Sequence, residues 1–141
     1  MDNVVLKKKW EDEECIELSI ISQSQYVIVN QNCYISKEAL AGNSEMIRSY
    51  IEGTNEKTYI SFGNKEGNYT PAFSMEIMPP NDYGHITIEM DMEIDDNTTR
   101  SHRCKFFVRT EMGLLEEFGK GLYSVCNESC GTTLELNRKD A

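Results

Sequence analysis

The sequence is poor in the features that mark fibrous, low-complexity and membrane-spanning chains. Its 141 residues include only three prolines, nine glycines and one tryptophan, fewer prolines and glycines than collagen-like or low-complexity chains contain. No apolar run approaches the roughly 18 residues that a membrane-spanning helix needs, and the longest uncharged stretch, residues 18–36, is interrupted by Ser, Gln and Asn. The first residues also lack the order of charge and hydrophobicity of a secretion signal. We therefore expect a soluble cytoplasmic protein that does not associate with membranes.

Basic residues are scarce as well. The chain has 14 Lys and Arg residues against 24 Asp and Glu residues, which gives a formal net charge of −10. Such a charge repels nucleic acid and anionic lipid and speeds encounter with a basic protein. The one basic cluster with an aromatic residue, residues 7–10 (Lys-Lys-Lys-Trp), is followed at once by acidic residues 11–14. We interpret its lysines as protection of an edge strand against sheet-to-sheet pairing, and we predict no nucleic-acid binding.

The number of cysteines and the hydrophobic share limit the possible domain organisation. Five cysteines are an odd number, in a chain that is large enough to fold without disulfides, so we interpret them as reduced thiols. A hydrophobic share of 39% is sufficient for a buried core. We predict a single domain over residues 1–136 and a flexible tail over residues 137–141.

Hydrophobic periodicity indicates the secondary structure. Two stretches have helical spacing: one begins after Ser36, or after Asn43 in an alternative interpretation, and ends at Gly53, and a second follows Thr110, its predicted cap. Gly119 and Gly121 in the second helix suggest that its backbone lies close to the sheet. Predicted strands cover residues 4–6, 16–20, 26–35, 58–62, 73–78, 85–94, 102–110 and 132–136. The order predicts an α+β domain with a mostly antiparallel sheet of about six to seven strands and two helices packed on one face.

The strongest local pattern is a hairpin formed by residues 85–94 and 102–110, joined by a loop over residues 95–101. When residue 94 faces residue 102, opposite charges meet on one face, Glu93 with Arg103 and Asp91 with Lys105. On the other face apolar residues meet, in the pairs Met92–Cys104, Met90–Phe106 and Ile88–Val108. A slip of one residue would bury the charges, so this register is strongly favoured.

The first strand of this hairpin carries the candidate binding residues. Its carboxylates share one face and are continued by two acidic residues of the loop, and the set is Glu89, Asp91, Glu93, Asp95 and Asp96. Carboxylates on one strand lie about 6.5 to 7 Å apart, which is too spread for the converging oxygens that a hard cation requires. We expect this row to be neutralised partly by Arg103 and Lys105 and to contact a basic protein partner.

Other chemistry has weaker support in the sequence. Cys126, Cys130, His102 and Cys104 have the residue types of a zinc site, but the chain lacks the Cys-x-x-Cys spacing of structural zinc sites, and we predict no metal and no cofactor. There is neither a nucleophile elbow nor a phosphate-binding loop, so we predict no enzymatic activity. One alternative is a small-molecule-binding protein or small enzyme in which His85 or His102 acts as a base. Another is a structural subunit whose sheet edge pairs with a second copy.

The layout also resembles a known class of proteins. Opening strands, the helix from Ser36 to Gly53, a segment with phenylalanine and proline over residues 70–78, and a strand pair leading into the final helix occur here in an acidic domain. Over residues 27–125 this layout resembles immunity proteins that neutralise polymorphic, wall-associated toxins of bacteria. Those proteins are often rich in tryptophan, whereas this chain has only Trp10. The resemblance implies a binding protein that neutralises a basic toxin, and it assigns no functional residue.

Overall fold

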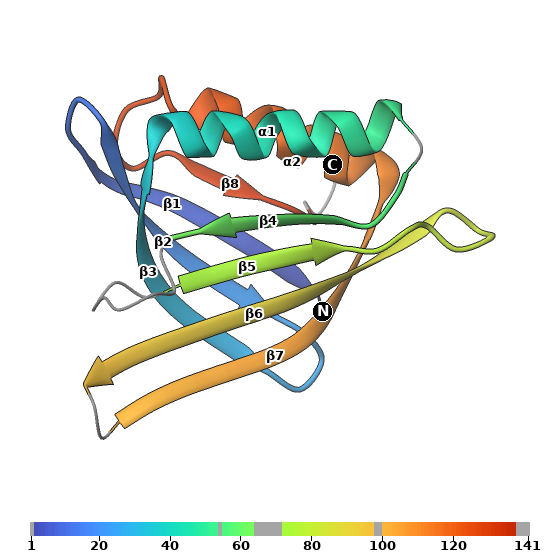
Figure 1. The fold of residues 1–141 in the computed structure, drawn as a ribbon, viewed down its shortest axis with the longest axis horizontal. Helices are drawn as coiled ribbons and strands as arrows, with labels where there is room; N and C mark the ends of the chain where they lie inside the picture. Colours follow the sequence, from blue (N-terminus) through green and yellow to red (C-terminus); the bar gives the residue numbers. More distant parts are fainter. Residues whose placement is uncertain (1, 54, 64–71, 98–99, 138–141) are drawn as a thin grey trace.

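A computed structural model describes residues 2–53, 55–63, 72–97 and 100–137, with only the backbone described at 72, 94–97, 100 and 101. Within these residues the chain is an α+β protein with two helices and eight strands (Figure 1). The elements are β1 (Asn3–Glu11), β2 (Cys15–Gln23), β3 (Ile28–Ser36), α1 (Lys37–Glu52), β4 (Thr58–Phe62), β5 (Ala72–Ile77), β6 (His85–Asn97), β7 (Arg100–Glu111), α2 (Met112–Val125) and β8 (Thr133–Glu135).

The described strands form two antiparallel sheets rather than one. The first sheet has the order β3-β2-β1-β8, and the second sheet has the order β4-β5-β6-β7. Figure 1 shows the two sheets facing each other, with α1 and α2 lying along the side where β8 and β4 are the edge strands. The predicted single sheet of about six to seven strands with helices on one face is therefore wrong. Alternation gives each strand one buried face, and two facing sheets satisfy that pattern as well as a sheet covered by helices.

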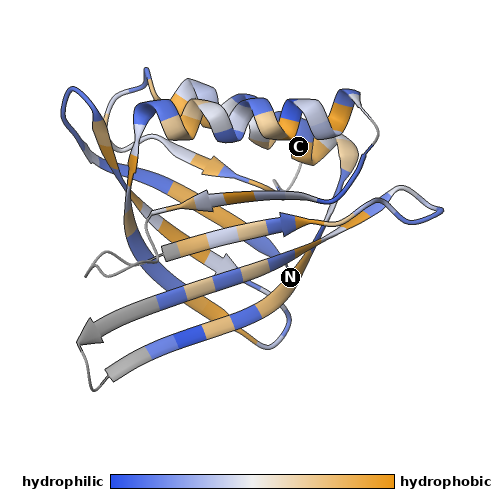
Figure 2. Ribbon diagram, viewed as in Figure 1, coloured by the Kyte–Doolittle hydropathy of each residue, from blue (hydrophilic) through white to orange (hydrophobic). Residues whose placement is uncertain are grey.

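The core lies between the sheets and beneath the helices. One buried cluster includes inward side chains from both sheets and from both helices, among them Leu18, Met90, Ile47 and Phe118. Figure 2 shows hydrophobic and hydrophilic residues alternating along the strands, as one buried face for each strand requires. The final helix is thus one of several elements that cover the apolar face of β6 and β7.

The register predicted for β6 and β7 is confirmed. Glu93 faces Arg103, Asp91 faces Lys105 and Met90 faces Phe106. Both strands extend further than predicted, because Asp95 faces Ser101 and Asn97 faces Arg100. The connection is therefore shorter than the predicted loop over residues 95–101.

The two helices begin differently. The Ser36 side chain accepts a hydrogen bond from the Ala39 N–H at 3.0 Å, so α1 begins where the first interpretation placed it and not after Asn43. Before α2 the capping position is occupied by Glu111, which makes no side-chain capping bond. The prediction of Thr110 as the cap is wrong, because the strand continues one residue further and the Thr110 hydroxyl donates to Asn137 instead.

Glycines allow two close contacts of α2. A Cβ atom at Gly121 would collide with the side chain of Leu134, just as the predicted approach of the helix to the sheet requires. A Cβ atom at Gly119 would lie 2.6 Å from Cγ2 of Ile47, which belongs to α1 rather than to the sheet. Gly119 therefore serves the packing of the two helices against each other.

Strand β1 is a central strand, paired with β2 on one side and with β8 on the other. The interpretation of residues 7–10 as part of an edge strand is therefore wrong. Lys8 is fully buried, and its ammonium group donates to the carbonyl oxygens of Val125 and Glu128. The inward position follows from alternation, since Val4 and Leu6 point into the core on the same face.

Asn137 connects the two sheets. Its side-chain Nδ2 donates to the carbonyl oxygen of Asp2 at 2.9 Å and to that of Arg109 at 2.7 Å, and its Oδ1 accepts from the Thr110 hydroxyl at 2.8 Å. Its backbone N–H donates to Oδ1 of Asn3 at 2.8 Å. Asn137, the first residue of the predicted tail, is thus bound to both sheets, and residues 138–141 lie outside the described part.

Candidate functional site

Strand β6 places the predicted carboxylates on the outer face of the second sheet. Glu89 and Glu93 are half-buried there, while the intervening Met90 and Met92 point into the core. The side chains of Asp95 and Asp96, the other two predicted binding residues, lie outside the described part of the structure. The three carboxylates whose side chains are described therefore lie on the face that the alternation predicted.

Asp91 in the middle of this row is not a free carboxylate. It is only 6% exposed, and the guanidinium group of Arg103 binds both of its oxygens, with Nε to Oδ1 at 3.1 Å and Nη2 to Oδ2 at 2.8 Å. This hydrogen bonding, with the charge of Asp91, raises the pKa of Arg103. The ion pair is diagonal, because the residues that face each other are Asp91 with Lys105 and Glu93 with Arg103. Asp91 is therefore buried and paired, and it offers little surface for the partner contact that the sequence predicted at this position.

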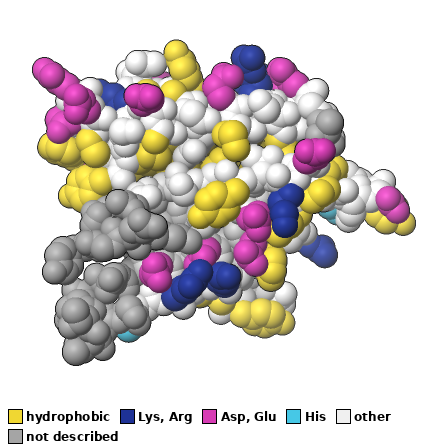
Figure 3. All heavy atoms as spheres, in the orientation of Figure 1, with side chains coloured by type: hydrophobic (Ala, Val, Ile, Leu, Met, Phe, Trp, Pro, Cys, Tyr) yellow, Lys and Arg dark blue, Asp and Glu magenta, His cyan; other side chains and the backbone are white. Residues whose placement is uncertain are grey.

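The outer face of the second sheet carries both signs of charge. Strand β7 presents Arg103, Lys105 and Arg109 there, next to the carboxylates of β6. Figure 3 shows acidic and basic side chains side by side over this sheet. Neither Lys105 nor Arg109 forms an ion pair with a described residue. The excess negative charge of the chain is therefore not concentrated on this face, which has a basic stripe along β7.

The backbone of β7 has groups that point away from β6. At Arg109 the N–H donates to the Asp2 carboxylate at 2.9 Å, and the carbonyl oxygen accepts from Asn137 at 2.7 Å. Along a strand the backbone N–H and C=O groups of successive residues point alternately to the two sides, so the groups of every second residue point to the same side. We call the backbone N–H and C=O groups of three such residues the β7 edge: Arg103, Lys105 and Phe107. In the described ranges no strand pairs with this side of β7.

A groove lies at the Phe107 end of the β7 edge. Its volume is about 780 Å³, and it lies between β7 and the turn that joins β2 to β3. Phe106 and Phe107 line one side, and Tyr26 and Val27 line the other. Phe107 is 56% exposed and Tyr26 is 87% exposed. We call this feature the hairpin groove, and Phe107 and Tyr26 leave aromatic surface open to solvent there.

Sequence reasoning missed Phe107. From Arg103 to Glu111 the outward positions of β7 carry charged residues except at Phe107, so this residue interrupts the alternation of polar and apolar side chains. That interruption was visible in the sequence. The position of β7 at the edge of its sheet was not, because alternation does not tell how strands are ordered in a sheet.

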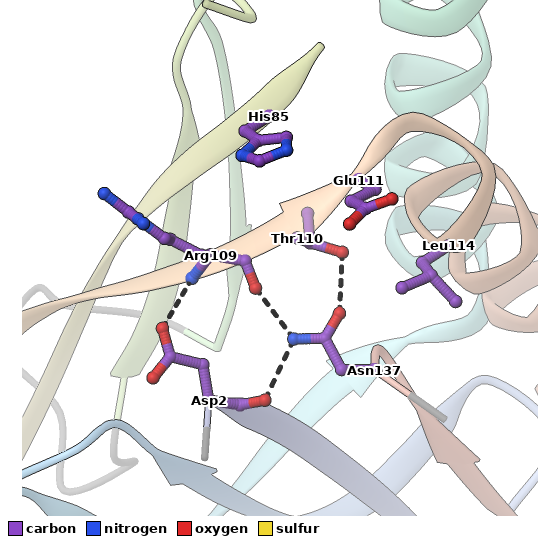
Figure 4. A pocket seen from close by; sticks show the side chains of 7 residues that line it. All are labelled: Asp2, His85, Arg109, Thr110, Glu111, Leu114 and Asn137. Carbon is purple, nitrogen blue, oxygen red and sulfur yellow. Dashed lines mark hydrogen bonds between the residues drawn. The ribbon is translucent and has the colours of Figure 1, made fainter. Parts of the chain in front are cut away.

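A second hollow surrounds His85. It has a volume of about 390 Å³ and is lined by residues that include His85, Glu111, Asp2 and Leu114 (Figure 4). His85 faces Glu111 across the β6–β7 pair. The imidazole itself makes no hydrogen bond to a described residue, and the nearby polar groups of Asp2 and Asn137 are bonded to each other or to β7. A histidine beside a carboxylate is the arrangement that the ligand-binding alternative requires.

The residues considered for zinc do not form a site. Cys126 lies at the end of α2, whereas His102 and Cys104 lie on β7. Across the described ranges, no three His, Cys, Asp or Glu side chains gather so that they would hold a metal ion. Burial raises the pKa of the Cys126 thiol, which disfavours the thiolate that zinc binds.

Comparisons with known proteins assign no family. No protein-family model, no curated protein sequence and no solved structure matches this chain. In the described part of the chain, neither helix combines the length and the apolar character that crossing a bilayer requires. The function must therefore be argued from the surface itself.

Proposed function

We propose that this protein is a non-enzymatic protein-binding module of the cytoplasm, which docks its partner on the outer face of the second sheet and along β7. One observation carries the proposal: Phe107, an exposed aromatic residue, lies between Lys105 and Arg109, whose side chains form no ion pair with a described residue, on a strand whose outer side pairs with no described strand. Aromatic and arginine side chains are the residues that most often dominate binding energy at protein interfaces. Free strand edges add backbone hydrogen bonds to such contacts.

The predicted acidic residues have a supporting part in this proposal. Glu89 and Glu93 flank the Asp91–Arg103 pair on β6 and remain partly exposed. They would contact basic residues of the partner, while Lys105 and Arg109 contact acidic ones. Charges of both signs favour specific orientation more than affinity. A toxin with a basic surface is the partner class that the layout resemblance suggests.

Site-specific photo-cross-linking in the source cells tests the docking face. Phe107 is replaced by p-benzoylphenylalanine, and a matched protein carries the same replacement at Met46, an exposed residue of α1. We expect one protein adduct from position 107 that position 46 does not give, with its identity obtained by mass spectrometry. Identical adducts from both positions, or none from position 107, would contradict the proposal.

Charge reversal then tests the carboxylates. With the identified partner purified, the double variant Glu89→Lys/Glu93→Lys is compared with Glu45→Lys/Glu52→Lys, which makes the same change of charge on α1. Calorimetric titration should show weaker binding for the first variant and nearly unchanged binding for the second. Equal effects of the two variants would mean that only the net charge matters.

A second candidate function is favoured by the hollow around His85. Facing Glu111 in a pocket of about 390 Å³, His85 is placed to bind a small molecule or to accept a proton from it. A fragment screen monitored by the imidazole proton signals of His85 tests this function. Signals that stay constant with every fragment, in a protein that still binds its protein partner, would remove this candidate.

A further inference from the structure

We infer that the β7 edge accepts an extended acidic segment of the partner protein, which pairs with β7 and adds a strand to the second sheet. This inference rests on the proposed protein-binding function and specifies the chemistry of the partner. It uses three features of the described residues: the free backbone groups of β7, the charge of its outward side chains and the adjoining hairpin groove.

The backbone defines where a visiting strand pairs. The edge-facing groups of Arg109 are already bound by Asp2 and Asn137. The groups of Arg103, Lys105 and Phe107 point in the same direction and have no hydrogen-bond partner among the described residues. A visiting strand therefore pairs alongside these three residues and ends where Asp2 occupies the edge.

The side chains define its charge. The Arg103 side chain is neutralised by Asp91, but the side chains of Lys105 and Arg109 form no ion pair with a described carboxylate. Residues directly opposite each other in an antiparallel pair share a face, and opposite charges there are favourable. The visiting strand therefore places a carboxylate opposite Lys105 and an apolar side chain opposite Phe107. A carboxylate two residues beyond the one opposite Phe107, past the end of the pairing, would lie near the Arg109 side chain.

The hairpin groove defines the character of the visiting strand's other side chains, which alternate with those opposite Lys105 and Phe107. Side chains opposite Phe106 point to the other face of the sheet, where Tyr26 and Val27 form the far wall of the groove. The groove volume of about 780 Å³ accommodates several apolar side chains. The segment that fits is therefore an amphipathic strand, in which acidic and aromatic residues alternate with aliphatic ones.

A second copy of this chain fits less well. In an antiparallel pair of two β7 strands centred on Phe107, Lys105 of each copy would face Arg109 of the other. Like charges directly opposite each other destabilise a strand pair. The occupant is therefore a different protein, and self-association is one of the outcomes that the test separates.

Synthetic peptides test the inference with the complete chain. The probe is a capped, fluorescein-labelled peptide in which glutamate alternates with valine around one tyrosine, and the matched control has lysine for each glutamate. We expect saturable binding of the acidic peptide by fluorescence anisotropy, binding roughly tenfold weaker for the lysine peptide, and weakening with added salt. Absence of binding, or equal binding of both peptides, would overturn the inference.

Three further measurements separate strand pairing from simple ion pairing. The acidic peptide should slow hydrogen exchange at the amides of Arg103, Lys105 and Phe107, and N-methylation of its edge-facing amides should abolish binding. In the protein, both Lys105→Pro and Lys105→Ala remove the charged side chain, but only Lys105→Pro also removes the edge-facing N–H, which β6 does not use. We expect Lys105→Pro to lose binding more completely than Lys105→Ala. Binding that survives peptide N-methylation overturns strand pairing, even where Lys105→Pro does not fold.

The remaining outcomes distinguish this inference from the proposed function. If the acidic peptide does not bind while cross-linking at position 107 still captures a protein, the inference of an acidic visiting strand is wrong and the proposed docking face stands. If cross-linking also fails, both are wrong. Dimers seen by analytical ultracentrifugation that Lys105→Pro dissolves would replace the acidic partner with a second copy.

Discussion

The ammonium group of Lys8 lies 2.9 Å from the carbonyl oxygen of Val125, the last residue of α2. It also donates to the carbonyl oxygen of Glu128 at 2.7 Å and pairs with the Glu11 carboxylate at 2.9 Å. The side chain is fully buried. A cation is favourable at the carboxyl end of a helix, where unpaired carbonyl groups carry partial negative charge. Lys8 therefore fastens β1 to the end of α2.

Replacement of Lys8 by methionine should destabilise the protein. The Lys8→Met substitution preserves most of the side-chain volume but leaves the carbonyl groups of Val125 and Glu128 without their donor. The cost of such unsatisfied groups predicts a loss of about 2 kcal/mol in the free energy of unfolding, measured by urea denaturation. Lys7→Met, at an exposed position of the same strand, should change it by less than about 0.5 kcal/mol. Similar losses for both variants would contradict the role assigned to the buried ammonium group.

The pH dependence of stability should depend partly on Glu11. Hydrogen bonds from Lys8 and Lys37 lower the pKa of Glu11 below its ordinary value of 4.5. Because the folded-state pKa is lowered, the stabilisation is complete above the unfolded pKa and is lost as the pH falls through the folded pKa. Glu11→Gln should therefore flatten the decline in the free energy of unfolding between about pH 6 and pH 3. If the free energy of unfolding, measured by urea denaturation, declines equally steeply in both proteins across this interval, the ion pairs of Glu11 contribute nothing to the pH dependence of stability.

The packing of the helices predicts opposite effects for two glycines of α2. Gly119→Ala places a methyl group 2.6 Å from Cγ2 of the buried Ile47. We expect a loss of about 1 to 2 kcal/mol, because overpacking outweighs the gain in helix propensity. Gly113→Ala, with no atom within 4 Å of the added group, should instead stabilise by up to about 1 kcal/mol. Thermal and urea denaturation measure both, and stabilisation by Gly119→Ala would show that the helices can separate at this contact.

The cysteines should differ strongly in reactivity. Burial raises the pKa of Cys33 to about 12, so this thiol stays protonated and shielded in the folded protein. Cys130 is exposed and free. In iodoacetamide labelling of the native protein at about pH 8, followed by peptide mass spectrometry, we expect Cys130 to react first and Cys33 only after unfolding. Early modification of Cys33 would indicate opening of the first sheet.

Local patterns in the sequence predicted much of this structure. The register of β6 against β7 followed from charges and apolar residues that match in one alignment only, and Ser36 was recognisable as a helix cap. The pairing of strands into two sheets was not predictable, since both arrangements bury one face of each strand. Similarly, alternation places Lys8 inward, but its acceptors at Val125 and Glu128 are distant in sequence.

The candidate site was predictable only in part. Glu89, Asp91 and Glu93 share the face that alternation assigned to them, but the burial of Asp91 depends on the three-dimensional surroundings of Arg103. Phe107 was a visible exception in an alternating strand. Its meaning depends on the edge position of β7 and on the turn that carries Tyr26, and both come from tertiary structure.

The hydrogen bonds of Asn137 have a mechanical consequence. One amide side chain holds the start of β1, through Asp2, and the end of β7, through Arg109 and Thr110. The two sheets cannot separate at this corner of the molecule without first breaking these hydrogen bonds. We expect the whole chain to melt in a single step, because neither layer can begin to unfold there while the other stays intact.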